Sequence, residues 1–281
     1  MDLVFSDIHA DIDGLESILK VTSSSEFVKK YGSFSRIINL GDVLERGIYP
    51  KQVISRLQSL EKNYPIHSVI GNHDEAFLHN KLIGASSIES MDAHAKLNND
   101  DISFFKQNSD RTFGQQLYAD KKNKLLCVHG GPLDPKKITP ENANDESWLY
   151  HRSWQRLTPE DFEFFSYSGY HYKATSAFEE AKRNESSIIL CGHQHEEAAL
   201  IQDDTVREIY HSLKVTQEKT GNHILEKREI EINPSHNYII RLGLGGPAGK
   251  YGGGHADPHF GIIQYDPKKV TLFTIKSQNQ T

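Results

Sequence analysis

Five short clusters of acidic, histidine, asparagine and glycine residues recur along this chain, each directly after a short apolar run. They are Asp7-Ile-His9, Gly41-Asp42 with Arg46-Gly47, Gly71-Asn72-His73-Asp74, His129-Gly130-Gly131 and Gly192-His193-Gln194-His195. Each apolar run is typical of a buried strand. Because open α/β sheets place their ligands at the carboxyl ends of strands, the recurrence predicts that the five clusters meet at one edge of a sheet.

The pattern between the clusters predicts an α/β fold. Strands are expected at 3–5, 36–40, 66–70 and 125–128, and helices at 13–21, 50–60 and 74–82. From residue 188 onward the chain changes to successive strands, expected at 188–191, 197–201, 206–211, 223–232, 237–242, 260–265 and 270–275. The alternation indicates a parallel-centred sheet, and the C-terminal strands indicate a second sheet packed on it. We expect a single domain over 1–281.

Three segments interrupt this pattern. Residues 83–120 are expected to form a mostly helical insertion near the active site, and 142–182 are again mainly helical. A third segment has seven glycines between Gly243 and Gly254. It is not a P-loop, because Leu244 stands where the leading glycine is needed and Tyr251 replaces Ser or Thr. We expect a mobile or tightly turning loop there.

Composition excludes several classes of function. The net charge of −6 gives no general attraction to nucleic acid or to an anionic membrane. No apolar stretch approaches the roughly 20 residues of a membrane span. The two cysteines, Cys127 and Cys191, lie in apolar runs and are typical of core residues rather than of a disulfide framework. The N-terminus leaves no room for a signal peptide, so we expect a cytoplasmic protein.

The residue types in the five clusters suit a metal site. Carboxylates, imidazoles and an amide carbonyl are ligands of divalent ions such as Mn²⁺, Fe or Zn²⁺. The spacing of Asp7 and His9, and of His193 and His195, puts each pair on one face of an extended segment. A single such pair is commonly surface decoration. Five clusters in order, each after a strand, support one another.

The ordered set resembles the calcineurin-like metallophosphoesterase superfamily, whose motifs read D-x-H, G-D-x-x-x-R-G, G-N-H-(D/E), H-G-G and G-H-x-H. The resemblance extends from Asp7 to His195. It implies a four-layer fold of two mixed sheets packed together and flanked by helices. It also implies hydrolysis of a phosphate ester by a hydroxide that bridges two divalent metal ions, with Mn²⁺ favoured and Fe or Zn²⁺ as alternatives.

The resemblance also implies the ligands of each ion. One ion would be held by Asp7, His9, Asp42 and His195. The second would be held by Asp42, Asn72, His129 and His193. Asp42 would therefore bridge the two ions.

The resemblance further implies catalytic and phosphate-binding roles. His73 matches the general acid, and Asp74 would orient its imidazole. Arg46 matches the arginine that binds the phosphate oxygens, and Asn72 also faces the phosphate. Arg152, in the stretch SWLYHRSW, is a second arginine candidate, with stacking on Trp148 or Trp154 as its structural alternative. His255 and His259, after the glycine-rich segment, are candidates for the wall of the substrate pocket.

Three functions stay open at this point. The first is hydrolysis of phosphate monoesters, on a phosphoprotein or a small phosphorylated molecule, and the G-D-x-x-x-R-G and H-G-G motifs favour it. The second is a phosphodiesterase or dinucleotide polyphosphate hydrolase. A non-catalytic scaffold is the third, although no ligand position has been replaced. Ala10, Glu45 and Asp74 depart from the bacterial Ser/Thr phosphatase pattern, and the C-terminal segment loosely resembles the bacterial phosphodiesterase-like branch. The sequence favours no oligomeric state.

Overall fold

The first apolar run of the chain, β1 (Asp2–Phe5), lies inside a large mixed sheet. The computed structural model describes residues 1–81, 83, 86–105, 114–143, 148–158, 168–249 and 256–276. Within these residues the sheet has the order β11-β12-β15-β14-β1-β2-β3, with β1, β2 and β3 parallel and the other neighbours antiparallel. Its other strands are β2 (Arg36–Asn39), β3 (Ile66–Ser68), β11 (Thr216–Thr220), β12 (His223–Glu231), β14 (His259–Tyr265) and β15 (Lys268–Lys276).

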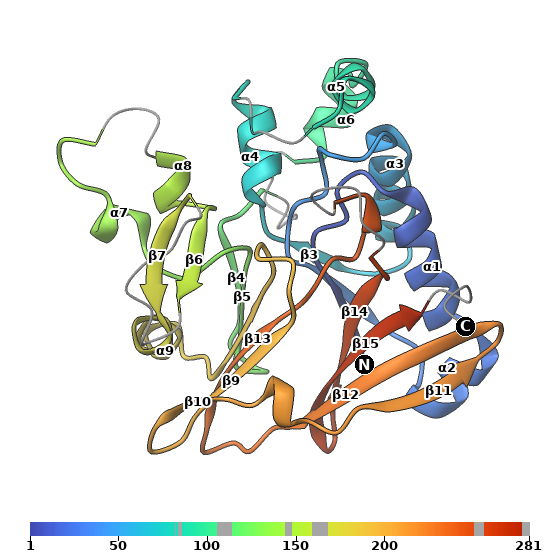
Figure 1. Cartoon of the computed structure of the whole chain (residues 1–281), viewed down its shortest axis with the longest axis vertical. Coiled ribbons are helices and arrows are strands. Elements are labelled where there is room, and N and C mark those ends of the chain that lie inside the picture. Colours follow the sequence, from blue (N-terminus) through green and yellow to red (C-terminus); the bar gives the residue numbers. More distant parts are fainter. Residues whose placement is uncertain are drawn as a thin grey trace.

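A second large sheet packs on the first (Figure 1). Its order is β10-β9-β13-β8-β5-β4, and β13, β8 and β5 run parallel. Its strands are β4 (Leu117–Asp120), β5 (Leu125–Val128), β8 (Ile188–Cys191), β9 (Ala198–Gln202), β10 (Val206–Glu208) and β13 (Asn237–Arg241). A small parallel pair, β6 (Gln155–Thr158) and β7 (Tyr170–Lys173), lies apart from both.

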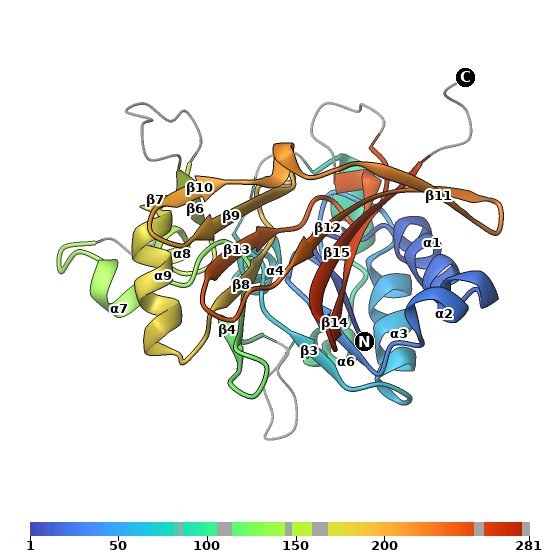
Figure 2. The ribbon, with the colours of Figure 1, turned by 90° about the horizontal axis from the view of Figure 1, so that it is seen from below.

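Helices cover the outer faces of the two sheets (Figure 2). The first sheet is covered by α1 (Ile12–Thr22), α2 (Ser25–Tyr31) and α3 (Pro50–Glu61), and the second by α9 (Ala174–Arg183). Asp11 starts α1 by accepting a hydrogen bond from Gly14 N, and Leu15, Ile18 and Leu19 face the sheet. The other helices are α4 (Asn72–Leu78), α5 (Ile88–His94), α6 (Asn99–Ser103), α7 (Pro135–Ile138) and α8 (Trp148–His151), with 3₁₀ turns at Tyr210–Ser212 and Pro247–Gly249.

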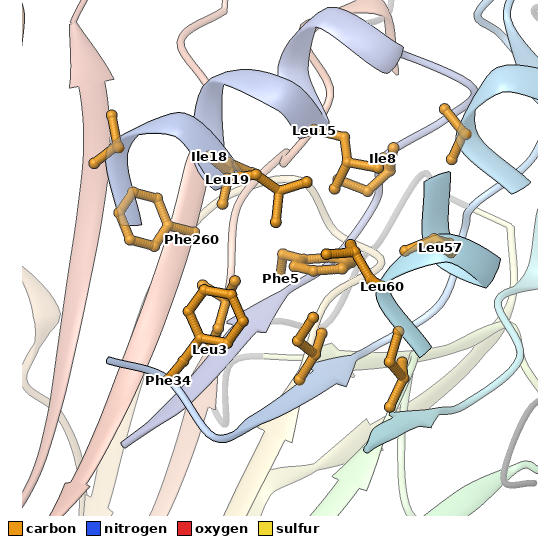
Figure 3. Close-up of a cluster of buried hydrophobic side chains, with 14 of the residues drawn as sticks. Leu3, Phe5, Ile8, Leu15, Ile18, Leu19, Phe34, Leu57, Leu60 and Phe260 are labelled. Carbon is orange, nitrogen blue, oxygen red and sulfur yellow. The ribbon is translucent and has the colours of Figure 1, made fainter. Parts of the chain in front are cut away.

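Within the described residues, strand alternation separates three hydrophobic cores. In β1, Leu3 and Phe5 pack under the helices with Leu15 and Ile18 (Figure 3), whereas Val4 packs between the two sheets. In β5, Cys127 likewise faces the space between the sheets, and its neighbours in the strand face α9. Three cores between four layers confirm the expected α/β sandwich of two mixed sheets flanked by helices.

The structure corrects or refines three expectations from the sequence. The C-terminal strands do not build the second sheet alone: β11, β12, β14 and β15 complete the first sheet, whereas β8, β9, β10 and β13 lie in the second. Where it is described, the insertion expected at 83–120 contains the helices α5 and α6 and ends in strand β4. The segment 142–182 contains the parallel pair β6 and β7 beside its helices.

The two cysteines and the helices also bear on the expectations from composition. Cys127 and Cys191 are buried free thiols, as expected of core residues. Among the helices in the described parts of the chain, none combines the length and the apolar character needed to cross a membrane.

Candidate metal centre

The turns that follow β1, β2, β3, β5 and β8 converge at one end of the two sheets. The turn after β1 is hydrogen-bonded to the turn after β2, with 2.9 Å from Asp7 N to Gly41 O and 2.9 Å from His9 N to Asp42 O. The turn after β8 binds the end of β5 through Gly192 N and His129 O, at 2.9 Å. The sheet edge thus brings together side chains from positions 7 to 195 of the chain.

Several of these side chains stand on left-handed backbone. The φ angles are 54° at Asp7, 48° at His9, 54° at Asp42, 69° at His193 and 62° at His195. Non-glycine residues occupy this region at a cost of about 1–3 kcal/mol each, and they keep it where the surroundings over-determine the conformation. Such clustering is typical of a functional site.

The side chains form two overlapping groups of metal-ligand type. Asp7, His9, Asp42 and His195 form the first group, and Asp42, His129 and His193 form the second, with ligand atoms within 4.8 Å of one another in each. In the first, Asp7 Oδ1 lies 3.4 Å from His195 Nε2 and 3.8 Å from His9 Nε2. In the second, Asp42 Oδ2 lies 3.3 Å from His129 Nε2. Asp42 is the member common to both groups.

Asp7 and Asp42 each use one carboxylate oxygen for a backbone hydrogen bond and leave the other to this cluster. Asp7 Oδ2 accepts a hydrogen bond from His193 N at 3.0 Å, and Asp42 Oδ1 accepts one from His73 N at 2.9 Å. The other oxygens, Asp7 Oδ1 and Asp42 Oδ2, are buried without a hydrogen-bond partner among the described residues. Buried carboxylate oxygens are costly when unsatisfied, so these atoms fit bound cations.

The histidines present their Nε2 atoms to the same space. His129 Nδ1 donates to Leu40 O at 2.7 Å, and His9 Nδ1 lies 3.2 Å from Leu44 O. Anchoring Nδ1 to a backbone carbonyl leaves Nε2 as the ligand atom. His193 Nε2 is buried and has no hydrogen-bond partner within the described part of the chain. Asn72 Oδ1 lies 3.0 Å from His129 Nε2, which adds an amide oxygen to the second group.

Burial and charge set the protonation of the cluster. Burial lowers the pKa of His9 and of His193, so both imidazoles are neutral and can donate a lone pair. Burial alone would raise the pKa of Asp42, but the neighbouring histidines, His129 first, hold it well below its ordinary value. Asp42 in turn outweighs burial at His129 and raises its pKa to about 9. A metal ion held by His129 would therefore displace a proton.

Close backbone approach is built into this edge. A Cβ atom added at Gly71 would lie 1.9 Å from Asp42 Oδ1, so only glycine lets the turn before α4 reach the shared carboxylate. The glycine-rich segment supports the turn after β1 in the same way. Gly245 N donates to Ser6 O at 2.9 Å and Gly246 N to Asp7 O at 3.1 Å. Where it is described, the segment is a tight turn, as one of the two expectations had it.

The structure corrects the partner expected for His73. Asp74 does not orient this imidazole, because its carboxylate accepts hydrogen bonds from Val43 N and Leu44 N, both at 2.9 Å, and from Gly71 N at 3.0 Å. Burial, with the charge of Asp42, raises the pKa of Asp74 to about 7. Glu45 is the partner instead: its Oε2 lies 2.7 Å from His73 Nδ1. The sequence signal was Glu45 itself, directly before Arg46 in the G-D-x-x-x-R-G motif.

Arg46 reaches both His73 and the first donor group. One of its terminal nitrogens lies 3.2 Å from His73 Nε2, and the other lies 3.4 Å from His195 Nδ1. A planar guanidinium in this position can donate several hydrogen bonds to phosphate oxygens.

Arg152 and His259 lie in other contacts. Arg152 forms an ion pair with the buried Glu75 of α4, at 2.8 Å. His259 is buried in β14, where its Nδ1 accepts a hydrogen bond from Gly243 N at 3.1 Å. It therefore holds the start of the glycine-rich segment and does not form an exposed pocket wall. His255 lies outside the described residues.

The model of the calcineurin-like phosphoesterase family matches residues 3–197 of the chain. No curated protein matches the chain significantly. A metallophosphoesterase structure from Sphaerobacter thermophilus is 18% identical, with a TM-score of 0.59, over 99% of this chain and 88% of that one. A serine/threonine phosphatase structure from Saccharomyces cerevisiae is 13% identical, with a TM-score of 0.51, over 100% and 81%. At these identities the solved structures establish the likeness of the fold.

Proposed function

Since this chain belongs to the calcineurin-like phosphoesterase family and is thereby a metal-dependent phosphoesterase, we propose that its substrates are phosphate monoesters. The substrate class is a phosphoprotein or a small phosphorylated molecule. The observation that carries this proposal is the position of Arg46. Its guanidinium contacts both His73 and His195, and His195 is a member of the first donor group.

Two divalent ions fit the donor set, and we propose Mn²⁺ as the ion. Asp7, His9 and His195 would hold one, His129 and His193 with Asn72 would hold the other, and Asp42 would join them. Mixed carboxylate, imidazole and amide donors suit this class of ion. When bound, such a pair activates water and neutralises charge on the phosphoryl group.

The protein itself supplies charge and a proton. A monoester presents three terminal oxygens and a diester only two, so a guanidinium beside the metal ligands favours the monoester. His73 Nδ1 is fixed by Glu45, which turns Nε2 toward Arg46. Because a guanidinium only donates, Nε2 accepts from Arg46 in this arrangement. Once a substrate phosphate takes Arg46 as its partner, a protonated His73 would be able to deliver its Nε2 proton to the leaving oxygen, with Glu45 stabilising the charged imidazole.

The test compares an alkyl phosphate with bis-p-nitrophenyl phosphate. Arg46→Ala should reduce kcat/KM for the monoester by a few kcal/mol in transition-state terms, the value of one preorganised donor, and should change the diester rate much less. Arg56→Ala is the matched control, because Arg56 lies on α3 and pairs with Glu16 at 2.6 Å. It should behave as the wild type.

The decisive comparison uses the wild-type protein. If it cleaves a diester or a dinucleotide polyphosphate with higher kcat/KM than any monoester tested, the monoester proposal is wrong. The same donor set would then serve the second function considered above.

A further inference from the structure

The turn that carries Glu45 and Arg46 is held in a strained conformation. Both residues have positive φ, 65° at Glu45 and 64° at Arg46, which non-glycine residues seldom adopt. The two side chains leave this turn toward the same imidazole, that of His73. A small change in the turn would therefore move a hydrogen-bond acceptor and a cation at once.

Side chains of one short segment bind the backbone of this turn at three successive residues. Ser90 Oγ donates to Gly47 O at 2.8 Å, and His94 Nε2 accepts from Glu45 N at 2.8 Å. Ser86 Oγ accepts from Arg46 N at 3.3 Å. Ser90 and His94 belong to α5, which contacts α3 and lies in the expected insertion (Figure 1).

His94 is fixed in the tautomer that this contact requires. Its Nδ1 donates to Ser90 O at 2.7 Å, so Nε2 keeps its lone pair for Glu45 N. The residue is 4% exposed and Ser90 is fully buried. Burial lowers the pKa of His94, which keeps the ring neutral and Nε2 an acceptor at neutral pH.

We propose that α5 is a positioning element for the reaction, in which His94 and Ser90 hold the turn that aims Arg46 and Glu45 at the phosphate site. The inference rests on the proposed function of Arg46, and it assigns to the insertion a purpose beyond covering the fold. Within the described residues, the side-chain contacts of His94 are with Glu45, Ser90 and Phe77, none of which is a proposed metal ligand. Its effect is transmitted through the backbone of residues 45–47.

The test replaces the acceptor on His94. His94→Leu removes it, whereas His94→Gln keeps an amide oxygen at similar reach. We expect His94→Leu to speed amide hydrogen exchange at residues 44–48 and to lower kcat/KM by about 100-fold, the loss typical of a misplaced catalytic group. Metal content should stay at the wild-type value. His94→Gln and the milder Ser90→Ala should lie between wild type and His94→Leu.

The matched control is Ile88→Ala, on the same helix, because Ile88 is 70% exposed. It should leave exchange and rate unchanged. In the Arg46→Ala, Glu45→Ala double variant, adding His94→Leu should lower kcat/KM little further, because the turn then carries neither side chain that it positions. An undiminished loss in that background would mean a general structural effect and would overturn the proposal, as would unchanged exchange at 44–48.

The proposed function can fail separately. If Arg46→Ala alone retains full monoesterase activity, Arg46 does not bind the phosphate. The exchange measurement would still decide whether α5 holds the turn. Full activity in His94→Leu despite faster exchange would remove the positioning role and leave the function of Arg46 intact.

Discussion

Asp42 serves the backbone with one oxygen and both donor groups with the other. We expect the wild type to bind about two ions per chain and Asp42→Asn to bind far fewer. His195→Ala should lose one ion at most, because His195 belongs only to the first group. Metal analysis of the purified variants checks this order. Equal metal content in the two variants would mean that Asp42 does not join the groups.

The contribution of His73 and Glu45 to kcat should depend on the leaving group of the substrate. His73→Ala should lower kcat for an alkyl phosphate by about 10²–10⁴-fold, the usual contribution of a general acid. The loss should shrink for p-nitrophenyl phosphate, whose leaving group hardly needs a proton. Glu45→Gln should show the same dependence on the ester, to a smaller degree. An equal loss on both esters would give His73 a structural role instead.

The glycine-rich segment and the turn after β1 pack so closely that one methyl group would separate them. A Cβ at Gly246 would lie 1.9 Å from Ile8 O, between Asp7 and His9. Gly246→Ala should therefore lower the free energy of unfolding by about 1–3 kcal/mol, the usual cost of overpacking, and weaken metal binding. Gly261→Ala is the control, because its Cβ would meet its nearest neighbour at 3.4 Å. Thermal unfolding should find that control close to wild type.

The sequence predicted the elements better than their partners. The runs around Leu3, Ile38 and Cys127 are strands because apolar periodicity reports burial, and their ends meet because parallel strands share an edge. Periodicity does not say which sheet a strand joins, so the C-terminal strands were assigned to one sheet although they divide between two. The helix α2 (Ser25–Tyr31) and the strand β11 (Thr216–Thr220) were not expected at all.

The candidate site shows the same division. The gathering of Asp7, Asp42 and His193 follows from motif order, which the sequence contains. The partner of His73 does not, because adjacency in sequence favoured Asp74, whereas the left-handed turn at Glu45 brings a residue 28 positions away to the imidazole. Backbone conformations of this kind leave no periodic trace in a sequence.

An ion cluster joins the two sheets at the end opposite the metal centre. Arg36 of β2 binds Asp2 of β1 and, at 2.6 Å, Asp120 of β4 in the second sheet. Tyr118 and Tyr265 complete it, with hydroxyls 3.1 and 2.9 Å from the guanidinium. The cluster therefore connects β1 of the first sheet to β4 of the second, at the end of the strands away from the metal ligands.

Removing the arginine should leave two poorly hydrated carboxylates side by side. Arg36→Met should lower the free energy of unfolding at pH 7 by about 3 kcal/mol, and the same change at the less buried Arg56 by at most about 1 kcal/mol. Burial raises the pKa of Asp120, but the hydrogen bonds from Asn123 and Arg36 outweigh burial and lower this pKa. Its contribution is thus present above the ordinary pKa of 3.8 and is lost as pH falls through the folded value. Denaturant titrations should show the Arg36→Met deficit narrowing in acid; a constant deficit would exclude the ion cluster as its source.

Because β1 lies between β2 and β14, the first sheet can form completely only after the C-terminal strands have been synthesised. Its antiparallel neighbour is β14, with Leu3 opposite Ile262, so β1 is synthesised long before the strand that pairs with it on this side. Such distant pairing slows folding, because the chain loses the entropy of loop closure before the stabilising contacts between the strands form. We expect nascent chains halted at residue 242 to bind no metal and to be digested readily by protease. Released chains that include β14 and β15 should become resistant to protease. Resistance that is already present in the halted chains would show that β1 has a temporary partner.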